Sequence, residues 1–161
     1  MGILDAALKL FGKGDGRNGK SEEVAAPGSK STILVIDDDL KFLETMRILL
    51  RGAGYNVLTS STGPKGLDTM RYAPRDVRAV LLDFNMPRFN GAETLEYLRK
   101  LNPHVKVIAV SGLKANELPQ NFQEGVERFV AKPFGNGELL QTIEEVLTGE
   151  SEEEMSAAAS A

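Results

Sequence analysis

Short runs of apolar residues alternate along the chain with longer stretches in which apolar residues recur at helical spacing. The runs are rich in Val, Ile and Leu and are bounded by charged or turn-forming residues, which is typical of buried strands in a parallel sheet. The predicted strands cover residues 32–36, 55–60, 77–82, 105–110 and 128–131. The predicted helices cover 39–53, 63–72, 92–101 and 136–147, and a poorly helical stretch, interrupted by Pro119, covers 114–124. Strands and helices that alternate in this way predict an α/β fold, with a parallel sheet covered on both faces and right-handed crossovers.

Three of the predicted strands stop at charged residues. These residues are Asp37, Asp38 and Asp39 after the first strand, Asp83 after the third and Lys132 after the fifth. If the strands are parallel, their carboxyl ends lie on one edge of the sheet, which is where open α/β sheets bind ligands. Carboxylates packed together raise one another's pKa unless a cation lies among them. The pattern therefore predicts a divalent metal and a reactive phosphate at this edge, and not a hydrophobic ligand.

The residue types at this edge suit that chemistry. Magnesium prefers oxygen ligands and usually takes one or two carboxylates together with phosphate oxygens and water, and Asp38 and Asp83 can supply the carboxylates. Lys132 can neutralise a phosphoryl oxygen or pair with Asp83. Ser111 adds a hydroxyl at the end of the fourth strand. Helix capping explains one aspartate of the triplet, Asp37 or Asp39, but it does not explain Asp83.

The amino-acid composition excludes several kinds of functional site. The chain of 161 residues has no cysteine, which excludes disulfides, thiolate metal sites and cysteine nucleophiles, and its single histidine, His104, excludes a multi-histidine site within one chain. The net charge is −4 and no basic run or face is evident, so we expect no nucleic-acid binding. No apolar stretch is long enough to span a bilayer and the start of the chain lacks the features of a secretory signal, so we expect a cytoplasmic protein.

Four segments together resemble the receiver domain of bacterial two-component response regulators, including the single-domain chemotaxis type. They occur in the order and with the spacing typical of that family, and the resemblance covers about residues 31–148. The segments are ILVIDDD (33–39), VLLDFNMPRFNG (80–91), VIAVSG (107–112) and FVAKPF (129–134). The resemblance implies a flavodoxin-like (βα)5 fold, in which a doubly wound five-stranded parallel sheet has the order 2-1-3-4-5.

The resemblance also implies a role for individual residues. Asp83 matches the phosphoacceptor, and Lys132 matches the lysine that contacts the phosphoryl group. Ser111 matches the switch hydroxyl and Phe129 the aromatic switch position. The implied ligands of Mg²⁺, with Mn²⁺ as an alternative ion, are Asp37, Asp38, Asp83 and the backbone carbonyl of Asn85. Asp39 has no implied role, and we expect it to cap the helix that follows.

One departure from the family pattern concerns the segment after Ser111. Pro119 removes a helical hydrogen bond there, so we expect the fourth helix to be short or displaced. Because that helix belongs to the usual output face of the family, the hypothesis follows that signal readout uses an altered surface.

The ends of the chain differ in composition from the predicted domain. Residues 1–11 have the spacing of a short amphipathic helix and are a candidate docking segment for a downstream protein, through residues 2–11. Residues 12–31 have the composition of a flexible linker, residues 32–148 form the predicted receiver domain, and residues 149–161 read as a disordered acidic and Ala-rich tail. Membrane association is not expected, because little positive charge accompanies the amphipathic segment.

We therefore expect a stand-alone response regulator, not an enzyme apart from Mg²⁺-dependent self-phosphorylation and autodephosphorylation. Its phosphodonor would be a histidine kinase or a histidine phosphotransfer protein, and its output partner is not given by the sequence. The alternative is a phosphatase of the haloacid dehalogenase type that uses Asp37 and Asp39. That alternative leaves Asp83 unexplained. A degenerate receiver that acts as a constitutive scaffold is a third possibility, but every expected polar residue is present.

Overall fold

The computed structural model describes residues 30–72 and 76–149, which form an α/β domain. The strands are β1 (Lys30–Ile36), β2 (Tyr55–Ser60), β3 (Val77–Leu82), β4 (Lys106–Ser111) and β5 (Arg128–Ala131). The helices are α2 (Leu40–Gly52), α3 (Gly63–Tyr72), α4 (Gly91–Leu101), the 3₁₀ turn η1 (Ala115–Glu117), α5 (Gln120–Glu124) and α6 (Asn136–Thr148). The strands and helices predicted from the sequence are confirmed, with small shifts at their ends: β1 begins at Lys30 instead of Thr32, and β4 covers Lys106–Ser111 instead of 105–110.

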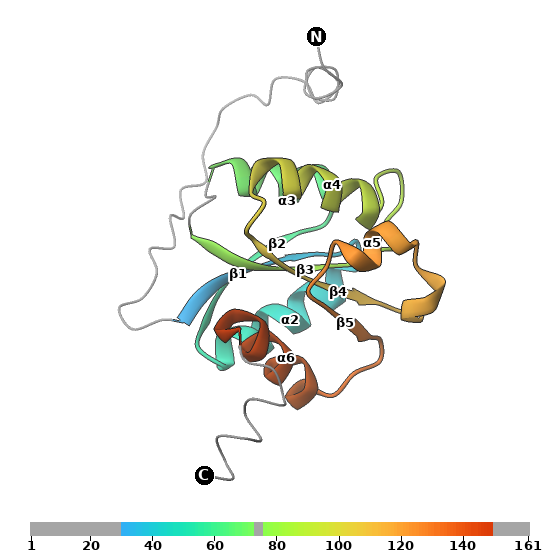
Figure 1. Cartoon of the computed structure of the whole chain (residues 1–161). Coiled ribbons are helices and arrows are strands. Elements are labelled where there is room, and N and C mark those ends of the chain that lie inside the picture. Colours follow the sequence, from blue (N-terminus) through green and yellow to red (C-terminus); the bar gives the residue numbers. More distant parts are fainter. Residues whose placement is uncertain (1–29, 73–75, 150–161) are drawn as a thin grey trace.

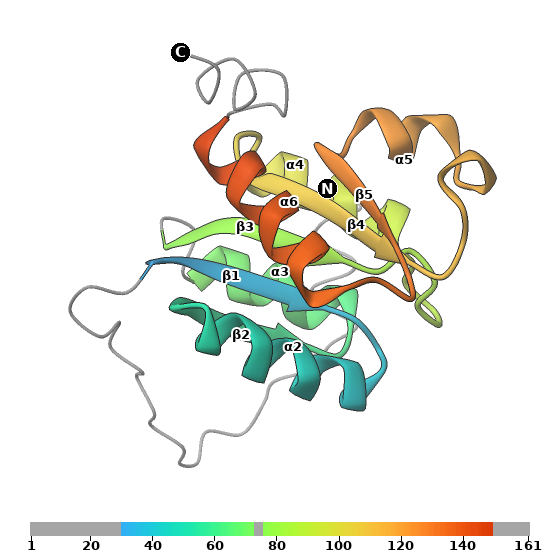
Figure 2. The same ribbon diagram turned by 90° about the horizontal axis from the view of Figure 1, so that it is seen from below.

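The five strands form one parallel sheet with the order β2-β1-β3-β4-β5, which confirms the order that the family resemblance implies. Helices α3, α4 and α5 cover one face of the sheet, and α2 and α6 cover the other (Figure 1). Figure 2 shows the second of these faces, with α2 and α6 in front of the strands. The arrangement is doubly wound, so the strand order changes direction between β1 and β3.

Each face of the sheet has its own hydrophobic core. On the α2 and α6 face, apolar side chains of alternate strand positions pack against Leu43, Leu50 and Ile143. On the opposite face, the other strand positions pack against Leu98 of α4 and Phe122 of α5. The central strands therefore bury both of their faces, which is why their sequences read as continuous apolar runs and not as an alternating pattern.

Helix α2 begins where the sequence indicates a cap. The Asp39 carboxylate accepts hydrogen bonds from the backbone N–H groups of Lys41 (2.9 Å) and Phe42 (3.2 Å). These bonds satisfy donors that have no partner within the helix. The chain then turns after the helix at Gly54, whose φ of 91° favours glycine. The prediction that Asp39 caps this helix is confirmed.

The segment after β4 is short, as Pro119 predicts. A 3₁₀ turn over Ala115–Glu117 is followed by the five-residue helix α5, with Pro119 as the residue before its first turn. Phe122 anchors this helix in the core with 1% of its surface exposed. The prediction of a shortened fourth helix is therefore confirmed, whereas its proposed consequence for signal readout stays a prediction.

Several predictions for the ends of the chain lie outside the described residues. These are the amphipathic segment at 1–11, most of the linker at 12–31 and nearly all of the tail at 149–161. Within the described residues, no helix is both long enough and apolar enough to cross a membrane.

Gly91 links the fold to the strand end that carries Asp83. A β-carbon at Gly91 would lie 2.5 Å from the carbonyl oxygen of Asp83 and 2.6 Å from the Cα of Phe84, which are backbone atoms that cannot move aside freely. We expect Gly91→Ala to lower the free energy of unfolding by about 2 kcal/mol or more, measured by urea denaturation.

Gly137→Ala in α6 is the matched control. Nothing lies within 4 Å of a β-carbon there, so we expect this change to raise stability by about 0.5–1 kcal/mol through helix propensity. Equal effects of the two substitutions would contradict the close approach of α4 to the end of β3.

Candidate functional site

The register of the central strands brings Asp37 and Asp83 side by side. Ile36 of β1 pairs with Leu82 of β3, and each aspartate is the next residue along its strand. The strand hydrogen bonding continues at these positions. The Asp83 N–H donates to the carbonyl of Ile36 (3.0 Å), and the Asp37 N–H donates to the carbonyl of Ser60 (3.1 Å). Both carboxylates are therefore fixed by the sheet, at the edge where the sequence predicts a site.

Three carboxylates meet at this edge. One oxygen each from Asp37, Asp38 and Asp83 can be chosen so that all three lie within 4.8 Å of one another. Asp37 and Asp83 are buried, with 2% and 6% of their surfaces exposed, whereas Asp38 is exposed. Oxygens bound to one Mg²⁺ in octahedral geometry are separated by roughly 3–4 Å, so small side-chain rotations bring this set into range. An all-oxygen donor set with access to water on one side suits a hard divalent cation.

The electrostatics of Asp83 are those of a crowded buried acid. Burial raises the pKa of the Asp83 carboxyl, and the neighbouring Asp37 charge raises it further, as does Asp38 more weakly. The Lys132 ammonium and a hydrogen bond from the Asn85 backbone N–H act in the opposite direction and lower the pKa. The raising effects prevail, so the ionised form of Asp83 is destabilised until a cation joins the cluster.

Lys132 lies at this edge but pairs with a partner other than the one considered from the sequence. Its ammonium donates to Oδ2 of Asp37 at 2.5 Å, not to Asp83. The backbone explains how it reaches the site, because the Lys132 N–H donates to the carbonyl of Ser111 (2.8 Å) and extends β5 by one residue. The second oxygen of Asp37 accepts from the Asp39 N–H (2.8 Å), so each of its two oxygens has a partner.

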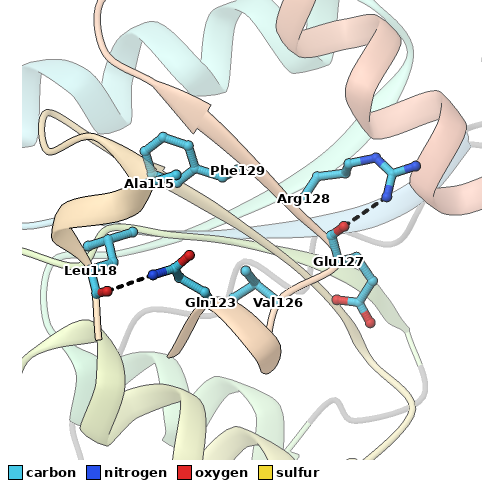
Figure 3. A pocket seen from close by; sticks show the side chains of 7 residues that line it. All are labelled: Ala115, Leu118, Gln123, Val126, Glu127, Arg128 and Phe129. Atoms are coloured by element: carbon cyan, nitrogen blue, oxygen red, sulfur yellow. Dashed lines mark hydrogen bonds between the residues drawn. The ribbon is translucent and has the colours of Figure 1, made fainter. Parts of the chain in front are cut away.

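Ser111 and Phe129, the two residues implied to act in switching, lie on neighbouring strands, β4 and the edge strand β5. Ser111 ends β4 and is completely buried, and its hydroxyl accepts a hydrogen bond from the Leu113 N–H at 3.3 Å. Phe129 is half-buried on β5 and lines a pocket of about 290 Å³ between β5 and the η1–α5 segment (Figure 3). Ala115, Leu118 and Val126 give this pocket an apolar lining, and Gln123, Glu127 and Arg128 lie at its polar side.

Two contacts near the site have no counterpart in the sequence-based predictions. The Phe42 ring of α2 lies under the Lys132 ammonium, 3.9 Å from the ring centroid, and packs edge-on against Phe134. The only sequence signal for this is that Phe42 closely follows the aspartate triplet on the helix that Asp39 caps. The second contact joins Arg99 to Glu127, which in turn accepts from the Val107 N–H at 2.6 Å. It ties α4 to the start of β5, and no local pattern indicates it.

The fold and the site define a class: a doubly wound α/β domain with a carboxylate cluster and one lysine at the carboxyl edge of its sheet. The model of the response regulator receiver domain family matches residues 33–144. The chain belongs to this family, which functions in two-component phosphorelay signalling and in which aspartate phosphorylation and Mg²⁺ binding are typical.

Individual relatives agree with this assignment. The cell cycle transcriptional regulator CtrA of Caulobacter vibrioides is 28% identical over 71% of this chain and 49% of its own length. The transcriptional regulatory protein KdpE of Mycobacterium tuberculosis is 34% identical over 69% of this chain and 48% of its own length. A solved CheY-like receiver domain from Methanospirillum hungatei JF-1 is 30% identical, with a TM-score of 0.68, and the match covers 75% of this chain and 96% of that one. The chain thus spans about half the length of these two curated relatives.

Removal of the charge on Asp83 tests the electrostatics of the cluster. In chelator-treated protein at neutral pH we expect Asp83→Asn to raise the free energy of unfolding by about 1 kcal/mol, because it removes a buried charge beside Asp37. The pKa of Asp83 is raised in the folded state, so the penalty is complete above that pKa and is lost as the pH falls toward the ordinary value of about 4. The stabilities of the two proteins should therefore converge as the pH is lowered.

Addition of Mg²⁺ provides the control for this prediction. We expect the ion to stabilise the wild type more than Asp83→Asn, since the variant lacks one of the three carboxylates. Equal stabilities at neutral pH, together with equal responses to Mg²⁺, would contradict a cluster of mutually repelling carboxylates.

Proposed function

We propose that this chain is a phosphorylation-controlled switch in which Asp83 accepts a phosphoryl group. The observation that carries the proposal is the placement of Asp83, buried at a strand end beside Asp37 and within the influence of Lys132. The family is typically phosphorylated on an aspartate, and Asp83 is the cluster member that ends the third strand of the sheet.

In the proposed reaction an oxygen of the Asp83 carboxylate attacks phosphorus in line with the leaving group. A new oxygen–phosphorus bond forms, and the bond from phosphorus to the donor, an imidazole nitrogen or the oxygen of a small phosphodonor, breaks and leaves its electron pair on the donor. Such transfers depend mainly on positioning and on neutralisation of charge. We propose that Asp37, Asp38, Asp83 and the backbone carbonyl of Asn85 hold Mg²⁺, with Mn²⁺ as an alternative, and the bound ion supplies that neutralisation.

The chain's own polar groups have separate tasks in this proposal. Lys132 now pairs with Asp37, and with a cation bound at Asp37 its ammonium would be available to a phosphoryl oxygen. The Ser111 hydroxyl, now engaged with the Leu113 N–H, donates to another phosphoryl oxygen. Because Ser111 and Lys132 are joined by a backbone hydrogen bond, movement at one is felt at the other, and Phe129 on β5 follows. Later attack by water on the phosphorus releases phosphate and restores Asp83.

The proposed partners follow from this chemistry. The phosphodonor is a histidine kinase or a histidine phosphotransfer protein, and the output is a change in affinity for a downstream protein. Residues 2–11 remain a candidate docking segment for that protein, and the stand-alone organisation and cytoplasmic location expected from the sequence stay predictions. The curated relatives named above are transcriptional regulators, whereas the described residues comprise a receiver domain without a DNA-binding domain.

Labelling by a small phosphodonor, such as acetyl phosphate or phosphoramidate, tests the site assignment. We expect the wild type to be phosphorylated in the presence of Mg²⁺, and labelling to fall at least 100-fold in Asp83→Asn or after chelation of the metal, because the nucleophile or the neutralising charge is lost. Intact-protein mass spectrometry measures the labelled fraction.

Asp39→Ser is the matched control for labelling. Serine retains the helix cap while the carboxylate is removed, so both stability and labelling should stay close to those of the wild type. The phosphatase alternative requires the reverse result, with Asp39 essential and Asp83 dispensable. Labelling that persists in Asp83→Asn would refute the proposed site.

Ser111→Ala separates phosphorylation from switching. Loss of the buried hydroxyl should leave labelling of Asp83 within about tenfold of the wild type, because the nucleophile is intact. We expect it to abolish most of the phosphorylation-dependent change in the NMR signals of the Phe129 ring. An unchanged Phe129 response in the variant would rule Ser111 out as the link between phosphate and β5.

A further inference from the structure

Lys132 makes two contacts at the acidic edge, and only one of them is the ion pair. Its Nζ lies 2.5 Å from Oδ2 of Asp37 and 3.9 Å from the centroid of the Phe42 ring. One quarter of the Lys132 side chain is exposed, so most of the side chain is buried at this edge. The ring face carries the negative part of the aromatic quadrupole and attracts a cation placed over it. The ammonium is therefore held between a carboxylate and a ring.

The ring is itself held in place by the loop that carries the lysine. Phe42 packs edge-on against Phe134, with centroids 6.1 Å apart and ring planes at 88°. Phe134 follows Lys132 and Pro133 in the loop between β5 and α6, so the aromatic pair joins α2 to this loop. On the other side, the Asp39 carboxylate accepts from the Phe42 N–H and fixes the first turn of α2. Phe42 is thus anchored at both its backbone and its ring.

The two contacts of Lys132 respond differently when a divalent cation enters the cluster. A cation that binds Asp37 takes up the charge that attracts the lysine, and it also repels the ammonium directly. Lysine has a flexible four-carbon stem, so without another partner its ammonium would gain freedom in water. The face of Phe42 is the one partner described here that a metal does not take, because an aromatic ring is not a ligand for a hard cation.

We propose that Phe42 is a positioning residue for Lys132. The Phe42 ring retains the Lys132 ammonium at the site while a cation occupies Asp37. The inference rests on the proposed function, since it gives Lys132 a place from which to reach the phosphoryl group. It assigns Phe42 no direct contact with the reacting atoms.

A double-mutant cycle in chelator-treated protein at low salt tests the contact without any metal. We expect Phe42→Leu to lower the equilibrium ratio of folded to unfolded protein. The factor by which this ratio falls should be at least threefold smaller when Lys132 is already alanine. Leu49→Ala, two helical turns further along α2, is the matched control, because it removes apolar packing from the same helix and leaves the Phe42 ring and its contact with Phe134 in place. Its penalty should be the same in both backgrounds. An equal Phe42→Leu penalty in both backgrounds would overturn the proposal.

Phosphorylation kinetics test the function of the contact. At saturating Mg²⁺ and with a small phosphodonor, we expect Phe42→Leu to be labelled about fivefold more slowly than the wild type, and Phe42→Tyr, which keeps the ring face, to recover most of the rate. Leu and Tyr variants that are equally slow, or a Leu variant as fast as the wild type, would overturn the proposal. If the wild type is not labelled on Asp83, the proposed function fails, and the metal-free cycle still decides whether Phe42 holds Lys132.

Discussion

The structure depends on the parallel register of β1 and β3, which forces two buried carboxylates to be neighbours. Ile36 pairs with Leu82, so Asp37 and Asp83 leave the sheet at the same level and cannot separate without breaking the strand hydrogen bonds at their own N–H groups. Apolar packing on both faces of the sheet holds these strands rigidly. The repulsion that results is therefore built into the fold, and it raises the pKa of Asp83. A cation can relieve this repulsion, and this makes the edge responsive to a bound metal ion.

The positive charge at this edge comes from the loop after β5, the strand at one side of the sheet. β5 delivers Lys132 through its backbone bond to Ser111, and the ammonium reaches across to Asp37 at the end of β1. One backbone bond thus links the residues proposed to contact the phosphoryl group. β5 also carries Phe129 into the pocket beside the η1–α5 segment, where Pro119 has shortened the helix. A change at the acidic edge has a short physical route to this surface, which supports the proposed switch.

The strands and the Asp39 cap follow from local sequence, because apolar runs, charged strand ends and an N-cap are signals carried by neighbouring residues, whereas the order of the sheet comes from the family resemblance. The contacts of the site do not follow from local sequence. Lys132 and Asp37 are 95 positions apart, and whether the lysine takes Asp37 or Asp83 depends on where β5 ends in three dimensions. In the sequence, Phe42 is simply one of the apolar residues at helical spacing, and nothing there indicates its contact with Lys132. The tie between Arg99 and Glu127 depends on the packing of α4 against the sheet, which no spacing rule contains.

We propose that Asp83, buried and crowded by Asp37 and Asp38, is the phosphoacceptor. The most direct measurement locates the modification itself: the protein is incubated with a small phosphodonor and Mg²⁺, the acyl phosphate is reduced with borohydride, and the site is read by peptide mass spectrometry. We predict a single Mg²⁺-dependent conversion, that of residue 83 to homoserine. Conversion at residue 37, 38 or 39, with residue 83 unmodified, would contradict it.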